Sequence, residues 1–133
     1  MTDWAKDIIE TAGLGTFVTN LFISQNPDVD DCIILYDEAG IPMSVDNAYA
    51  IDGYGLMVMT RGSYSYAKDK IWDIHRELVG RTMESHDDGT LVHCMIQSPP
   101  QYVENDDKGR RVFTAHYVSP VEQTTTGNRI TIN

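Results

Sequence analysis

The sequence predicts an α+β domain in which two helices flank a largely antiparallel or mixed β-sheet, in the approximate order αβββαβββ. Three observations lead to this fold class. The chain has 133 residues, which suits one domain. Two segments repeat apolar residues at the i, i+3, i+4, i+7 spacing of a buried helix face. The other apolar segments are short, rich in β-branched and aromatic residues, and separated by turn sequences.

The first third of the chain predicts one helix and two strands. A helix over about residues 3–12 begins with Thr2 as its N-cap and ends at Gly13, a typical C-terminal cap. The segment 15–24, GTFVTNLFIS, alternates in a way that predicts a strand covered on both faces. The fully apolar segment 32–36, CIILY, predicts a short strand.

The middle of the chain contains the helix with the most regular pattern. Residues 43–53 have no clear period, and 54–61 predict a strand. A helix then begins at Ser63 or Ser65 and extends to about Val79. Its buried positions are predicted to be Ala67, Ile71, Ile74 and Leu78.

The last third predicts a loop, a strand and a hairpin. After a polar loop over 81–89, the segment 90–98 predicts a strand. This strand is expected to end at Pro99-Pro100, because proline cannot donate to a central ladder. The Asp/Gly turn 105–109 lies between two β-rich segments and predicts a hairpin.

Residues 1–133 are expected to form a single domain with a polar C-terminal tail from about residue 120. No segment approaches the ~20 apolar residues of a membrane span, and the N-terminal segment does not resemble a secretory signal. Cys32 and Cys94 each lie inside an apolar segment, which favours buried thiols in a reducing cytoplasm over a disulfide.

The formal net charge of −10 is unevenly distributed along the chain. Residues 1–52 contain ten acids and one base, Lys6, whereas residues 53–133 contain ten acids and nine bases. A nucleic-acid binder needs a basic patch for phosphate contacts, so this composition excludes that class. The acidic surface serves either solubility or a directed contact with a partner.

Catalytic and metal-binding patterns are weak. The Gly-x-Gly pairs lack the continuation of a phosphate loop, and residues 28–31 lack the glycine and glutamate of a calcium loop. His86, Asp87 and Asp88 could bind a metal, but no second ligand pair at zinc spacing supports them. No serine lies in a nucleophile elbow. We therefore expect no catalysis, cofactor or metal, and rank a hydrolase around His86 last.

Charged residues supply the candidates for an interface. Lys108, Arg110 and Arg111 cluster at the predicted hairpin turn, so head-to-tail packing would let this basic tip meet the acidic face of another copy. An ordinary solvated turn is the alternative interpretation. The complete set of interface candidates is Lys108, Arg110, Arg111, Arg129, Arg61, Asp30 and Asp31.

Four ordered segments together resemble the tail terminator (also minor capsid or tail-to-head joining) proteins of long-tailed bacteriophages. They are LFISQNPDVDDCIILYDEAGIP at 21–42, MVMTRGSYSYAKDKIWDIHREL at 57–78, DDKGRRVFTAHY at 106–117 and TTGNR at 125–129. The resemblance implies a structural virion protein, assembled in the host cytoplasm, that forms a ring, sixfold in that family. Such a ring caps the tail tube, stops its polymerisation and joins it to the head.

The partners implied by this resemblance are further copies of the chain, the tail tube protein and the head connector proteins. DNA would pass through the ring without specific binding, because an acidic channel repels it. The charge of residues 1–52 also supports an alternative, a small acidic binding module or inhibitor that engages a basic partner protein.

Overall fold

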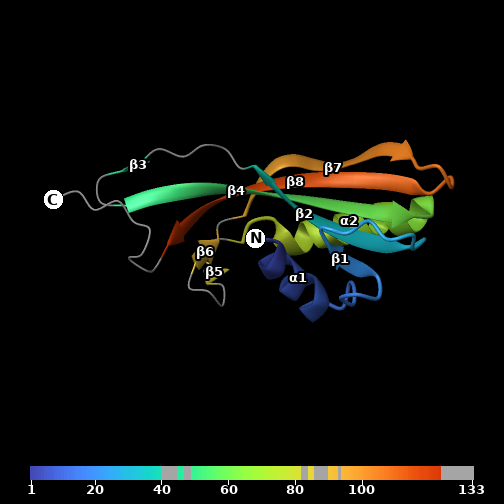
Figure 1. Cartoon of the computed structure of the whole chain (residues 1–133), viewed down its shortest axis with the longest axis horizontal. Helices are drawn as coiled ribbons and strands as arrows, with labels where there is room; N and C mark the ends of the chain where they lie inside the picture. The colour runs from blue at the N-terminus through green and yellow to red at the C-terminus, as the bar shows by residue number, and fades with distance from the viewer. Residues whose placement is uncertain (40–44, 47–48, 82–83, 86–89, 93, 124–133) are drawn as a thin grey trace.

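A computed structural model describes residues 1–39, 45–46, 49–81, 84–85, 90–92 and 94–123. Within these residues, two helices pack on an eight-stranded mixed sheet, which confirms the predicted α+β class (Figure 1). The elements are α1 (Thr2–Thr11), β1 (Leu21–Ile23), β2 (Cys32–Ala39), β3 (Val45–Asp46), β4 (Tyr49–Gly62), α2 (Tyr64–Leu78), β5 (Glu84–Ser85), β6 (Thr90–Val92), β7 (Met95–Asn105) and β8 (Arg111–Gln123).

The sheet is built around the long antiparallel pair β4 and β8, which run side by side along the long axis of the molecule (Figure 1). The strand order is β1-β2-β4-β8-β6-β5, with β3 paired to β4 and β7 paired to β8. β1 and β2 are parallel, and the other strand pairs of the described chain are antiparallel. β1 and β7 therefore lie at opposite edges of the sheet.

Helix α2 matches its prediction closely. Its N-cap is Ser63, whose hydroxyl accepts a hydrogen bond from the backbone N–H of Tyr66 at 3.2 Å. The predicted buried positions are all 0% exposed and pack against the sheet, and they are Ala67, Ile71, Ile74 and Leu78. The helix ends because the chain turns to extended backbone at Val79 and reaches φ +81° at Gly80.

Apolar side chains are buried on both faces of the sheet. The larger core lies between the sheet and the helices, where Tyr117 is fully buried and its hydroxyl lies 2.6 Å from Nδ1 of His75. Burial, reinforced by the charge of Arg76, lowers the pKa of His75. A smaller cluster on the other face contains Phe22, Cys32 and Ile34. Both cysteines are buried free thiols, as predicted.

The N-terminal predictions need two corrections. Met1, not Thr2, is the N-cap of α1, and Thr2 lies buried inside the helix. The predicted strand over 15–24 is wrong except at β1. Residues 16–20 form a turn in which the carbonyl oxygen of Thr16 accepts three backbone N–H groups at 3.1 Å. These local bonds satisfy the backbone without a neighbouring strand.

The rest of the chain needs four corrections. The predicted strand over 90–98 is divided between β6, which ends at Val92, and β7, which begins at Met95. β7 continues through Pro99 and Pro100, because it pairs on one side only, with β8, and its register shifts between Ser98 and Gln101. β4 already begins inside the segment 43–53, and β5 lies inside the predicted loop. The hairpin of β7 and β8 is confirmed.

Strand β8 continues to Gln123, which lies in the first residues of the predicted polar tail. The rest of that tail lies outside the described residues. No helix in the described part of the chain has the length and apolar character needed to cross a membrane.

Candidate subunit interface

The turn of the β7–β8 hairpin contacts the loop that precedes β2, and we call this contact the ionic junction (residues 26–31 and 106–110). Arg110 is its centre. The guanidinium Nε lies 2.6 Å from Oδ2 of Asp106, and Nη1 lies 3.1 Å from Oδ1 of Asp28 and 3.4 Å from Oδ1 of Asp30. Lys108 forms an ion pair with Asp28 as well. The junction thus joins two segments about 80 residues apart in the sequence.

Arg61, near the end of β4, binds the loop that precedes β2 from its buried side. Its side chain is 4% exposed, and its guanidinium donates to Asn26 Oδ1 at 2.6 Å, to the carbonyl of Pro27 and to the carbonyl of Val29 at 2.8 Å. The guanidinium Nε lies 4.0 Å from Oδ2 of Asp106. Because one planar group satisfies three acceptors, Arg61 fixes the loop geometry from a single buried position.

Gly62 follows Arg61 and lets the loop approach β4 closely. It has φ +152°, and a Cβ atom added there would overlap Oδ1 of Asp31. Any larger residue would therefore displace Asp31 and with it the end of the loop.

The electrostatics of the junction favour the charged forms of its carboxylates. The hydrogen bond and the charge of Lys108, together with those of Arg110, lower the pKa of Asp28. Partial desolvation by itself would raise the pKa of Asp106. Hydrogen bonds from Arg110 and from the backbone of Lys108 outweigh it and leave the pKa lowered. Carboxyl groups with lowered pKa values stabilise the folded state above their unfolded-state pKa. The junction therefore weakens as the pH falls through the folded-state values.

The structure places the charged interface candidates in different environments. Lys108, Arg110 and Asp30 make ion pairs within one subunit, and Arg61 is buried. Asp31 is exposed, and Arg129 lies outside the described residues. Arg111 is exposed and has no ion pair with a described residue. The contact between basic tip and acidic segment that was expected between copies is thus present inside one subunit for Lys108 and Arg110.

We expect Arg110→Gln and Arg111→Gln to behave differently although the two arginines are neighbours. Arg110→Gln removes the centre of the junction and lowers the urea midpoint of the purified protein. Arg111→Gln removes a solvated charge, and its free energy of unfolding stays within about 0.5 kcal/mol of the wild type. Equal midpoints for the two variants, measured at pH 7 by circular dichroism, would show that the junction does not hold the loop.

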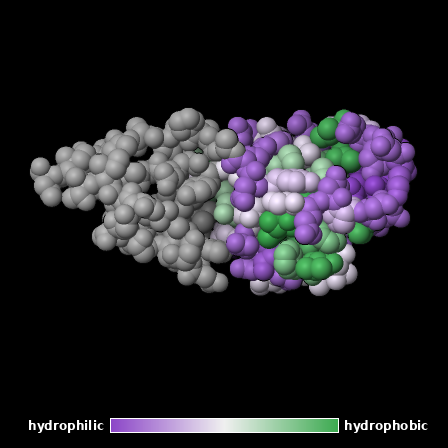
Figure 2. Space-filling model, viewed as in Figure 1, coloured by the Kyte–Doolittle hydropathy of each residue, from purple (hydrophilic) through white to green (hydrophobic). Residues whose placement is uncertain are grey.

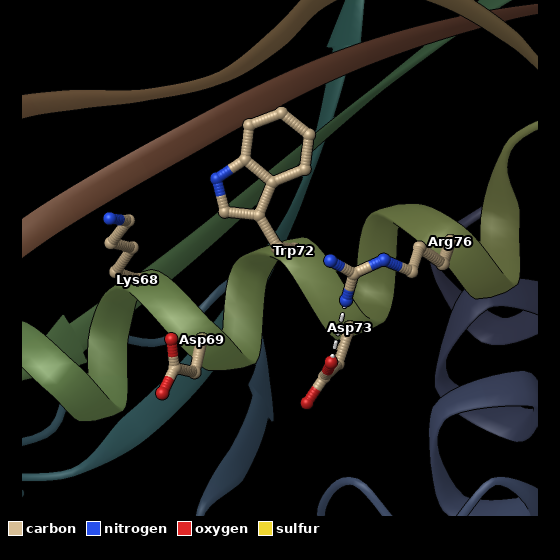
Figure 3. Close-up of a pocket in the computed structure, with 5 residues that line it drawn as sticks. All are labelled: Lys68, Asp69, Trp72, Asp73 and Arg76. Atoms are coloured by element: carbon tan, nitrogen blue, oxygen red, sulfur yellow. Dashed lines mark hydrogen bonds and ion pairs between the residues drawn. The ribbon is translucent and has the colours of Figure 1, made fainter.

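A shallow groove along α2 contains five polar or aromatic side chains (Figure 3). In this view Lys68 and Trp72 lie on one side of the helix, whereas Asp69 and Asp73 lie on the other. Arg76 Nη1 lies 2.9 Å from Asp73 Oδ1. Among the described residues, no group of three or more His, Cys, Asp or Glu side chains could hold a metal ion. His86, Asp87 and Asp88, the candidate metal ligands, lie outside the described residues.

The sequence patterns missed a second kind of surface, made of exposed apolar side chains. Figure 2 shows hydrophobic surface at two places, over β7 and over the loop after α1. The exposed large hydrophobic residues are Phe17, Val18, Tyr64, Met95, Ile96, Tyr102 and Val103. The alternation along 15–24 predicts that Phe17 and Val18 lie in a covered strand, so the sequence pattern did not indicate that they are exposed.

Comparison with known proteins identifies a matching family and a solved structure with a similar fold. Residues 8–119 match the family model described as "Bacteriophage tail terminator protein". The structure is similar to a chain of the "Virion of native gene transfer agent (GTA) particle", with a TM-score of 0.52 and 14% identity, over 86% of this chain and 84% of that chain. At this identity the likeness concerns the fold alone. No curated protein sequence matches the chain.

Proposed function

The chain belongs to the bacteriophage tail terminator family, and from this membership we propose that its copies form a ring, a hexamer, on the end of the tail tube. The ring stops polymerisation of the tube and forms the surface that joins the tail to the head. The match over residues 8–119 carries this proposal, because it includes the last turn of α1, all of α2 and the whole β7–β8 hairpin turn.

The proposed partners are other copies of the chain, the tail tube protein and the head connector proteins, with assembly in the host cytoplasm. The role is structural and needs no catalysis. A formal charge of −10 on each copy supports passage of DNA through the ring without specific binding, because like charges repel. The two unlike edges of the sheet support a ring, because head-to-tail contacts need two different surfaces on one subunit.

Negative-stain electron microscopy of tail tubes tests this function. Tubes polymerised with the purified protein are expected to carry a ring at one end and to stay shorter than tubes polymerised without it. Tubes of unlimited length with bare ends at every protein concentration would contradict the proposal. A salt-sensitive one-to-one complex with a cationic protein, without rings, would instead support the acidic binding module.

A further inference from the structure

The exposed apolar residues of the described chain gather at two opposite edges of the sheet. Phe17 forms a bridge to Leu21 of β1 and so lies beside the first edge strand, next to Val18. Met95, Ile96, Tyr102 and Val103 belong to β7, the edge strand on the other side of the sheet. No member of this group lies on β2, β4 or β8, the strands between the two edges. Exposed apolar surface concentrated in this way marks interaction sites.

Hydrogen bonds fix the backbone of the loop beside β1. Val18 has φ +70° and is 68% exposed, although a β-branched residue rarely adopts this conformation. Its N–H donates to the carbonyl of Leu21 at 2.8 Å, and the N–H of Phe17 donates to Oε2 of Glu10 at 3.1 Å. A strained residue that displays its side chain to solvent points to a function for that side chain.

Acidic residues of α1 lie beside this loop. Asp3, Asp7 and Glu10 follow the i, i+4, i+7 spacing, so they lie on one face of the helix. Lys6 contacts Asp7 at 3.3 Å and Glu10 at 3.8 Å, and its Nζ lies 5.0 Å from the centre of the Phe17 ring. One lysine against three carboxylates leaves this edge negative. We call the loop and these carboxylates the β1 edge.

The opposite edge combines aromatic and basic side chains. The rings of Tyr102 and Tyr64 pack on Phe113 with centroid distances of 5.6 and 5.8 Å, and both tyrosines are about half exposed. Lys68 Nζ lies 5.5 Å from the Tyr64 ring, and Arg111 is exposed at the start of β8. Neither base forms an ion pair with a described residue. We call β7 and these neighbours the β7 edge.

We infer that the β1 edge of one copy binds the β7 edge of the next copy. Val18 and Phe17 contact the exposed apolar and aromatic side chains of β7, and the carboxylates of α1 face Lys68 and Arg111. The two surfaces complement each other in both apolar character and charge. Because they lie on opposite sides of one subunit, the contact repeats head to tail. This inference rests on the proposed ring and identifies the surfaces that build it.

Cross-linking of introduced cysteines tests the contact. Val18→Cys and Tyr102→Cys are placed in separate chains, mixed at high concentration or on tube ends, and treated with a short bis-maleimide. The mixture is expected to give 18–102 linked dimers, whereas each variant alone gives none. The buried Cys32 and Cys94 serve as the background in every arm. Four strand-to-strand steps separate the edges, about 19 Å, so a single chain carrying both changes links only to its neighbours.

A second variant separates assembly from folding. Val18→Gly removes the displayed side chain but suits φ +70° better, so the subunit unfolds at the same or a higher urea concentration than the wild type. Its self-association, measured by sedimentation equilibrium, is expected to weaken about tenfold. Association unchanged by Val18→Gly, or rings on tubes without any 18–102 cross-link, would overturn the inference and leave the proposed function intact. Cross-linked rings that do not bind tube ends would overturn the proposed function and leave the inferred contact intact.

Discussion

Replacing Arg61 with methionine is expected to lower the free energy of unfolding by about 3–5 kcal/mol. The guanidinium is 4% exposed and satisfies Asn26, Pro27 and Val29 together. Methionine fills much of the same volume but donates no hydrogen bond, so the three acceptors lose their partner. Hydrogen bonds to a charged group contribute about 1.5–3 kcal/mol each, which makes this the largest polar contribution we expect from one side chain.

Urea unfolding followed by tryptophan fluorescence measures this loss. Arg61→Lys keeps the charge but not the planar donor geometry, so its stability is expected to lie between the methionine variant and the wild type. Arg76→Met is the matched control, because Arg76 is an exposed arginine that bonds to Asp73 alone within the described part of the chain. A change of less than about 0.5 kcal/mol is expected there. If Arg61→Met resembled Arg76→Met, the loop before β2 would not depend on the buried guanidinium.

Local patterns predicted the elements whose burial follows a regular period. Helix α2 has its cap at Ser63 and its buried positions at the predicted spacing, and the Asp/Gly turn gave the hairpin correctly. The segment 15–24 failed because alternation alone cannot distinguish a strand from a turn stabilised by its own backbone hydrogen bonds. The predicted strand end at Pro99 and Pro100 was wrong because the effect of proline depends on whether the strand is central or at an edge.

The candidate interface was only partly predictable. The cluster of bases at the hairpin turn is visible in the sequence, but the partner of Arg110 is Asp28, 82 residues earlier. Only the register of β2, β4 and β8 brings these two segments together. The same register makes Arg61 an internal contact while Arg111, on the next strand, remains exposed. Residue type alone could not show which of the two arginines is buried and which is exposed.

The fold shows where the acidic residues of the first part of the chain lie. The sequence placed ten acids among the first 52 residues. The structure pairs two of them, Asp28 and Asp30, with bases of the hairpin, whereas Asp3 and Glu10 lie along α1. The acidic half of the sequence therefore contributes to two separate features, the ionic junction and the outer face of α1.

Replacing Ile71 with alanine is expected to lower the free energy of unfolding by about 2–5 kcal/mol. Ile71 is 0% exposed and lies in the middle of the buried face of α2, within the larger core. Its loss removes apolar contacts and leaves a cavity between the helix and the sheet, which packed neighbours fill only partly. Urea unfolding at pH 7 gives the magnitude.

Asp69→Ala is the matched control on the exposed face of the same helix, and it is expected to change stability by no more than about 0.5 kcal/mol. The pair also bears on assembly, because α2 carries Tyr64 and Lys68 of the β7 edge. Folded Ile71→Ala protein keeps those side chains on its surface, so its association, measured below the unfolding transition, is expected to equal that of the wild type. Weaker association of the fully folded variant would mean that the β7 edge depends on the packing beneath α2, and not only on the side chains it displays.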